Sequence, residues 1–250
     1  MSNEASERAF RTLEAMLVHI HRKQDMPALV ATLRERFHSA DAMFAASAHM
    51  LQKCGLNPRD ALLLSHMSDI TRYVRHSEYR EHPNLCCLQL AAEYLFTNFL
   101  GLQVEHFYIL CLNSRGRLME NIFLQEGTAD GALFDVKHML AEVVRVMPAA
   151  VVLSHNHPMG TLRPSQQDIV CTQDAMRALG AIGIPLLDHV ILAGKEPVSM
   201  RENGFIPSRI WSLQRPDFPL LQKWLDPPPP NAREKNFRHP RKNRTPENTQ

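Results

Sequence analysis

The chain has 250 residues, 44% of them hydrophobic, and a formal net charge of only +2 at pH 7. This length fits one large domain or two smaller ones, and the apolar share is enough to build a sizeable core. So small a charge does not by itself require a nucleic-acid partner. The N-terminus is polar, and no apolar run approaches the roughly 20 residues of a membrane span, so we expect a cytoplasmic protein with no membrane segment.

Residues 1–80 show helical periodicity and no convincing alternating strand pattern. Hydrophobic residues recur at helical spacing in two stretches, Phe10, Leu13, Leu17 and Ile20, and then Leu29, Leu33 and Phe37. Further short helices, broken at Gly55 and Pro58, are expected between about 40 and 76. We therefore predict a small helical domain over 1–80, with the polar stretch His76–Asn84 as a linker.

Within this region, Leu51–Ala61 is similar to a helix-hairpin-helix, whose Gly-apolar-Gly turn presents backbone N–H groups to a nucleic-acid phosphate. Asn57 stands where the second glycine would be, and its short polar side chain tolerates a left-handed turn. Lys53 and Arg59 could add phosphate contacts. The surroundings include acidic residues, so a structural hairpin is favoured and weak DNA binding is the alternative.

From Leu85 the pattern changes to that of an α/β domain. The predicted elements are a helix over 85–100, strands over 104–112 and 117–124 joined by a hairpin-like turn, a helix over about 133–147, a strand over 149–153, a helix over 165–180 and a strand over 186–192. Helices flanking a small mixed sheet define this fold class. Five cysteines without a Cys-x-x-Cys pair favour a reducing compartment, and the adjacent Cys86 and Cys87 fit buried helix positions better than redox chemistry.

Residues 208–250 form a third region. Four prolines after Asp226 break regular structure, and a basic end follows with Arg233, Lys235, Arg238, Arg241, Lys242 and Arg244. We expect a disordered solubilising tail, and the alternative is a nonspecific contact with nucleic acid that weakens as salt rises. Five hydrophobic residues before the tail could pack on the domain or on a partner: Phe218, Leu220, Leu221, Trp224 and Leu225.

The strongest functional signal is Ser154-His155-Asn156-His157-Pro158, followed by Ser165 and Asp168. The histidines are two residues apart, so at the end of a strand both imidazoles point to one face. Two imidazoles and a carboxylate suit zinc, and three protein ligands leave a fourth position for water. The alternative is an ordinary histidine pair followed by a helix whose N-cap is Ser165 and whose capping-box acid is Asp168.

This pattern resembles the JAMM motif of the JAB/MPN metal-dependent peptidase family. Leu187-Asp188-His189-Val190-Ile191, Gly127-Thr128 and the asparagine between the histidines make it most similar to the RadC-like branch, over roughly 85–207. The resemblance implies a cytidine-deaminase-like architecture and a zinc ion held by His155, His157 and Asp168. It also implies a glutamate on an upstream strand, a position that Glu105 takes.

The implied activity is zinc-dependent hydrolysis of a peptide or isopeptide bond in a peptide or protein substrate. Glu105 would be the general base, and Ser165 would donate a hydrogen bond to the oxyanion of the tetrahedral intermediate. Asp188 either orients a ligand histidine or, with His189, is a polar pair that finishes a helix-to-strand loop. His106 points to the opposite strand face from Glu105 and is not expected to be a ligand.

Two departures from the family pattern leave the substrate open. The loop after the histidines reads Pro158-Met159-Gly160-Thr161 in place of Pro-Ser-Gly-Asp, and 133–137 lacks the usual Pro-Arg-Glu. RadC-like proteins often carry a helix-hairpin-helix. A DNA-repair-associated DNA-binding protein that uses the zinc domain mainly as a scaffold is therefore the alternative function.

Overall fold

The computed structural model describes residues 3–20, 26–127, 134–158, 161–194 and 196–207, together with 220, 224 and 226. Its helices are α1 (Asn3–Ile20), α2 (Met26–Phe37), α3 (Ala40–Phe44), α4 (Ala48–Lys53), α5 (Pro58–Ser65), α6 (Met67–Glu78), α7 (Leu88–Phe99), α8 (Val136–Val146) and α9 (Gln166–Ala181). Its strands are β1 (His106–Leu112), β2 (Leu118–Glu126), β3 (Ala150–Asn156), β4 (Leu186–Ala193) and β5 (Glu196–Ser199).

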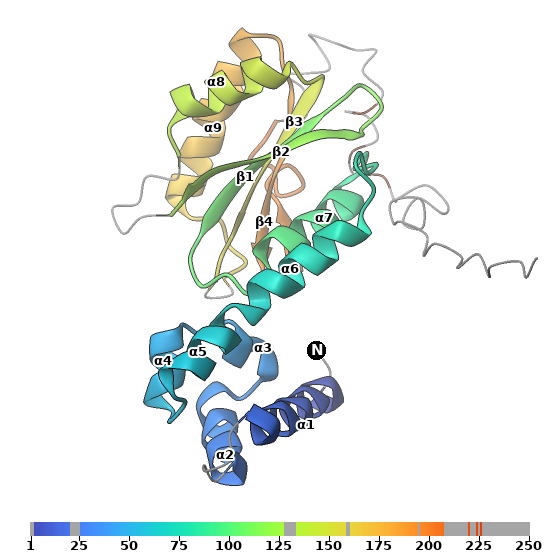
Figure 1. Cartoon of the computed structure of the whole chain (residues 1–250). Coiled ribbons are helices and arrows are strands. Elements are labelled where there is room, and N and C mark those ends of the chain that lie inside the picture. The colour runs from blue at the N-terminus through green and yellow to red at the C-terminus, as the bar shows by residue number, and fades with distance from the viewer. Residues whose placement is uncertain are drawn as a thin grey trace, which may run out of the picture.

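The strands form one mixed sheet in the order β2-β1-β3-β4-β5. Only β3 and β4 pair in parallel, connected through α9, and the other neighbours are antiparallel. Helix α7 covers one face of the sheet, and α8 and α9 cover the other (Figure 1). Every residue of β3 and β4 is buried, as expected for strands covered on both faces. The predicted α/β class with an N-terminal helical region is confirmed.

Each face of the sheet has its own hydrophobic core. Phe107, Ile109 and Leu153 point toward α8 and α9, while Leu110 and Val152 point toward α7. This alternation follows from the two-residue period of a strand. The α7 core also contains Leu220 and Trp224, so two of the five hydrophobic residues before the tail pack on the domain. The other three, and the basic tail over 227–250, lie outside the described residues.

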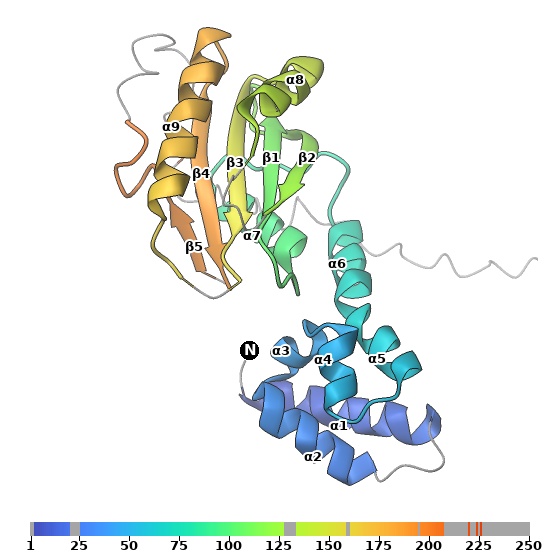
Figure 2. The same ribbon diagram turned by 90° about the vertical axis from the view of Figure 1, so that its left-hand side faces the viewer.

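The N-terminal helices build a separate core. Side chains from α1 to α5 pack there around Leu13, Leu33 and Leu51, which are almost completely buried. Helix α6 buries none of its residues and runs between this bundle and the sheet (Figure 2). It continues to Glu78, so the first residues of the stretch predicted as a linker are helical. None of the helices within the described ranges is long and apolar enough to span a membrane.

The hairpin between α4 and α5 differs from the left-handed turn predicted at Asn57. Gly55 takes the left-handed conformation, with φ +102°, while Asn57 is extended and caps α5 by accepting a hydrogen bond from the Asp60 N–H at 3.0 Å. An asparagine N-cap followed by Pro58 is a strong helix start. The N–H groups of Gly55 and Leu56 donate to Gln52 and Leu51 within the hairpin, so the backbone donors that a phosphate would need are already used.

The remaining differences lie at element ends. Strand β3 extends to Asn156, three residues beyond the predicted end, because its pairing with β1 continues to His155 and its pairing with β4 continues to Asn156. Strand β5, which carries a proline, was not predicted. Its antiparallel pairing with β4 forms that edge of the sheet.

Candidate metal centre

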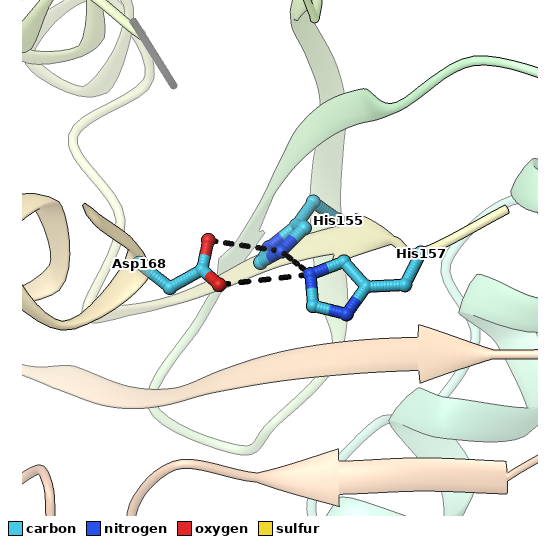
Figure 3. Close-up of side chains that lie close together, drawn as sticks. All are labelled: His155, His157 and Asp168. Atoms are coloured by element: carbon cyan, nitrogen blue, oxygen red, sulfur yellow. Dashed lines mark hydrogen bonds and ion pairs between the residues drawn. The ribbon is translucent and has the colours of Figure 1, made fainter. Parts of the chain in front are cut away.

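Three side chains converge at the C-terminal end of β3. His155 belongs to β3, His157 follows it directly, and Asp168 lies in the first turn of α9 (Figure 3). His155 Nε2 lies 2.9 Å from His157 Nε2 and 3.2 Å from Asp168 Oδ1, and His157 Nε2 lies 3.6 Å from Asp168 Oδ2. Ligands about 2.1 Å from a tetrahedral ion are roughly 3.4 Å apart, so these atoms match a single ion.

The hydrogen bond at the other nitrogen of His157 decides which atom carries the proton. His157 Nδ1 lies 2.6 Å from the carbonyl oxygen of Thr161. A carbonyl oxygen can only accept, so Nδ1 carries the hydrogen and Nε2 presents a lone pair. That lone pair faces Asp168 and His155, which is the arrangement of a metal ligand oriented by a backbone carbonyl.

A longer chain of hydrogen bonds assigns the proton of His155 in the same way. Thr172 Oγ1 donates to the Asp168 carbonyl oxygen at 2.5 Å, so it accepts from His189 Nδ1 at 2.6 Å. His189 Nε2 then has no hydrogen and accepts from His155 Nδ1 at 2.8 Å. His155 Nε2 is left with a lone pair. Two imidazole lone pairs 2.9 Å apart repel each other, and a cation beside Asp168 removes that repulsion.

Burial and charge act together at the centre. Burial lowers the pKa of His155, and Asp168 only partly opposes this, so the ring is neutral as a ligand must be. At His157 the hydrogen bond to Asp168 and that to Thr161 outweigh burial and raise the pKa. Burial alone would raise the pKa of Asp168, but its contacts with His155, with His157 and with the Ser165 N–H hold it well below its usual range. The carboxylate is therefore ionised and available to a cation.

The helix cap predicted at Ser165 and Asp168 is present. Ser165 Oγ accepts the Asp168 N–H at 3.0 Å, and Asp168 Oδ2 accepts the Ser165 N–H at 2.6 Å, which completes a capping box at the start of α9. The two interpretations are compatible because the cap uses Oδ2 while Oδ1 faces His155. The cap thus holds the carboxylate in the orientation that a metal ligand needs.

Glu105 immediately precedes β1, beside the strand that carries the histidines. Its negative charge, like that of Asp168, opposes the lowering of the pKa of His155 by burial and contributes to the raised pKa of His157, so its carboxylate lies within electrostatic reach of the centre. Gly127 permits this placement: its N–H donates to the Glu105 carbonyl at 2.6 Å, and a Cβ at Gly127 would lie 2.9 Å from the Glu105 Cβ. Thr128 lies outside the described residues.

Asn156 holds the backbone on both sides of Glu105. Its Nδ2 donates to the Val104 carbonyl at 3.0 Å, and its Oδ1 accepts the His106 N–H at 2.8 Å. These bonds join residues 50 or more positions apart, and they position the strand that carries Glu105 relative to the histidines. The asparagine of the motif therefore connects its two halves.

The structure corrects one alternative and supports another. Asp188 does not orient a ligand histidine: it faces the α7 core, where Ser199 Oγ, the Arg201 N–H and Trp224 Nε1 donate to its carboxylate. The residue of this pair that contacts His155 is His189, whose Nε2 lies 2.8 Å from His155 Nδ1. His106 points away from the centre, as predicted, and its Nε2 lies 3.5 Å from the Glu126 carboxylate.

Comparison with known proteins identifies the family of this chain. The family model of the RadC-like JAB domain matches residues 85–205. A UPF0758 protein of Shewanella sp. (strain MR-4) is 30% identical over 179 residues, covering 71% of this chain and 80% of the relative. The chain belongs to the RadC-like JAB family.

Two further relatives are matched over more than four fifths of their own length. A UPF0758 protein of Shouchella clausii is 30% identical over 193 residues, covering 76% of this chain and 84% of the relative. A UPF0758 protein of Vibrio cholerae serotype O1 is 38% identical over 135 residues, which is 54% of this chain and 81% of the relative. These names assign no reaction, so the chemistry has to come from the site.

Two contributors to the site were missed in the sequence. Thr172 is an ordinary helix residue in any local pattern, and its role depends on the packing of α9 against β4. His189 was noticed only as the neighbour of Asp188. Its adjacency to His155 needs the parallel pairing of β3 with β4, in which Leu153 aligns with His189. Met159 and Gly160 of the divergent loop lie outside the described residues.

Proposed function

We propose that this RadC-like JAB protein is a zinc-dependent hydrolase that cleaves an amide bond, peptide or isopeptide, in a peptide or protein substrate. The observation that carries the proposal is the convergence of two histidine lone pairs and an ionised carboxylate on one point. Zinc held by His155, His157 and Asp168 would supply a Lewis acid and a bound water of lowered pKa. Three protein ligands leave a position open for that water.

Glu105 is the general base of this proposal. Its carboxylate is near enough to influence both histidines, and Asn156 and Gly127 position its backbone. In amide hydrolysis it takes a proton from the attacking water and delivers it to the leaving nitrogen. An amine is a poor leaving group unless it is protonated, so both transfers matter for the rate.

Ser165 is the proposed oxyanion donor. Its Oγ accepts the Asp168 N–H, which leaves the hydroxyl proton to be donated. The residue is exposed to solvent although its neighbour in the cap, Asp168, is buried. A substrate carbonyl can therefore approach Ser165 from outside while the metal ligands stay shielded.

The test uses the zinc-loaded protein on two substrate pools, one of proteome-derived peptides and one of peptides joined through lysine isopeptide bonds. Mass spectrometry should find new termini with the wild type and about 100-fold fewer with Glu105→Gln at equal zinc content. Glu126→Gln is the matched control because this exposed carboxylate pairs with His106, away from the centre. Cleavage unchanged in Glu105→Gln, or no cleavage of either pool by the wild type, would contradict the proposal.

The DNA-binding alternative stays a prediction. Its two supports are the α4–α5 hairpin, whose Gly55 and Leu56 N–H groups donate internally, and the basic tail, which lies beyond the described part of the chain. Deleting residues 227–250 tests it through the salt dependence of binding to duplex DNA. A salt slope unchanged by the deletion would exclude the tail as the contact.

A further inference from the structure

His189 and Thr172 are two buried polar residues close to the three candidate ligands. His189 has no exposed surface and Thr172 is 1% exposed, yet each forms polar contacts in a region lined by hydrophobic side chains. Neither can touch a substrate. His189 lies on the Nδ1 side of His155, whereas Nε2 of the same ring faces His157 and the Asp168 carboxylate.

We propose that Thr172 and His189 are positioning residues that select the tautomer of His155 and so make its Nε2 a metal ligand. The inference rests on the proposed metal site and names what prepares it. A neutral imidazole has one hydrogen and two nitrogens, so His155 can bind a metal through Nε2 only if Nδ1 carries the hydrogen.

The selection of the His155 tautomer begins at a backbone carbonyl, which can act only as a hydrogen-bond acceptor. The Asp168 carbonyl oxygen only accepts hydrogen bonds, and Thr172 Oγ1 lies 2.5 Å from it. Threonine at this helix position commonly bonds the carbonyl four residues earlier. With its only hydrogen directed at Asp168, or at the thioether of Met200 3.3 Å away, Thr172 must accept from His189.

The constraint then passes through two rings. His189 Nδ1 carries its hydrogen toward Thr172, so His189 Nε2 accepts, and His155 Nδ1 must be the donor across 2.8 Å. The Phe107 ring stacks on His155 with centroids 4.7 Å apart and restricts rotation of the imidazole. With its orientation and its tautomer both set, His155 directs the Nε2 lone pair at Asp168.

The chain of bonds starts and ends at metal ligands, because it runs from the Asp168 backbone through Thr172 and His189 to His155. It therefore also fixes the spacing between α9 and the sheet. His157 needs no such device because the Thr161 carbonyl four residues away sets its tautomer directly. The tautomer of His157 is thus set by the nearby backbone. That of His155 is set by His189, 34 residues away in sequence, which in turn bonds Thr172, 17 residues from it.

The decisive experiment measures the tautomer and the affinity separately. In the zinc-free wild type, ¹⁵N NMR of the histidine rings should show His155 as the Nδ1–H form, and in Thr172→Val it should show a mixture. Competition with a chromophoric chelator, using Zn²⁺ alone, should show affinity reduced about 10–100-fold in Thr172→Val and at least as much in His189→Leu. Thr172→Ser, which restores the hydroxyl, should recover wild-type affinity.

Thr97→Val is the matched control. Thr97 is also a buried helical threonine bonded to a backbone carbonyl, that of Tyr94, but it lies in α7 on the other face of the sheet. It should lose comparable thermal stability and keep full zinc affinity. Equal affinity loss in both valine variants, or an Nε2–H form of His155 in the wild type, would overturn the inference.

Failure of the metal site itself would give a different result. A wild type that binds no Zn²⁺ yet shows the Nδ1–H form, lost in Thr172→Val, contradicts the proposed function and supports the tautomer selection. If Thr172→Val fails to fold, the inference is tested by the tautomer of His155 in the wild type. The zinc affinities of Thr172→Ser and His189→Leu test it as well. Undiminished zinc affinity in a folded His189→Leu protein would overturn the inference.

Discussion

Asp188 and His189 are consecutive, fully buried polar residues of β4, and they belong to two different kinds of site. On the α7 face, Asp188 accepts hydrogen bonds from Ser199, Trp224 and the backbone N–H groups of His189 and Arg201. On the α9 face, the chain through His189 ends at two lone pairs that face each other. Burial of a polar group is common to both faces, and only the unmatched lone pairs indicate a ligand.

The two environments also affect ionisation differently. Burial raises the pKa of Asp188, although Ser199, Trp224 and the Arg201 N–H stabilise its charged form. Asp168 is also buried, but the two histidines hold its pKa far below the usual range. A carboxylate prepared for a cation is thus distinguished from a structural one by its neighbours, and the depth of burial does not separate them.

The largest expected effect is a loss of bound zinc when Asp168 is replaced, and no loss when Asp188 is replaced. Asp168→Ala and His155→Ala should each lose stoichiometric zinc, with affinity reduced more than about 100-fold, because a ligand atom is missing. Asp188→Ala should bind zinc at the wild-type ratio. Elemental analysis after zinc loading and desalting measures all three. Wild-type zinc content in Asp168→Ala would show that the ligand set is wrong.

Asp188→Ala, which should leave zinc binding intact, should strongly lower the stability of the fold. Asp188→Ala leaves the Ser199 hydroxyl, the Arg201 N–H and the Trp224 indole without their acceptor, at about 1–3 kcal/mol for each buried group. We expect the free energy of unfolding in urea to fall by roughly 3–5 kcal/mol. Asp174→Ala, which removes an exposed ion pair with Arg177, is the control and should change it by less than about 1 kcal/mol. Equal losses would contradict the structural role of Asp188.

The pH dependence of zinc binding should follow His157. Its pKa is raised in the metal-free protein, so a proton competes with the ion at this ring before it competes at His155, whose pKa is lowered. Affinity should be pH-independent above the raised pKa and fall about tenfold per pH unit below it. Calorimetry in buffers of different ionisation enthalpy would count the released protons. Release of none at the acid end of this range contradicts the assignment.

The smallest effect separates capping from ligand orientation. Ser165→Ala and Ser47→Ala each remove a serine N-cap, of α9 and α4, and should each cost about 1 kcal/mol in thermal unfolding. Only Ser165→Ala should also weaken zinc binding, by a few-fold, because it loosens the Asp168 side chain. Equal zinc affinity in both variants would mean that the cap does not orient the ligand.

Prediction succeeded where a residue's role depends on its immediate neighbours in sequence. The His-x-His spacing places both rings on one face, and the Ser165–Asp168 spacing produces the capping box, because both follow from local geometry. It failed at Asn57, which is extended, while Gly55, two residues earlier, takes the left-handed conformation. It also failed to say which of Asp188 and His189 faces the histidines. The face of each residue of β4 depends on a register shift in the β3–β4 pairing between Val151 and Val152.

The amino-acid sequence by itself therefore determined the fold class, the three candidate ligands and the candidate base. Each of these follows from a local period, a cap or a motif. Only the tertiary structure decided what prepares the ligands: Asn156 reaching the backbone beside Glu105, and Thr172 and His189 aligned behind His155. These contacts join residues 17 to 52 positions apart, and hydrogen-bond roles are settled only when donor and acceptor meet in the folded chain.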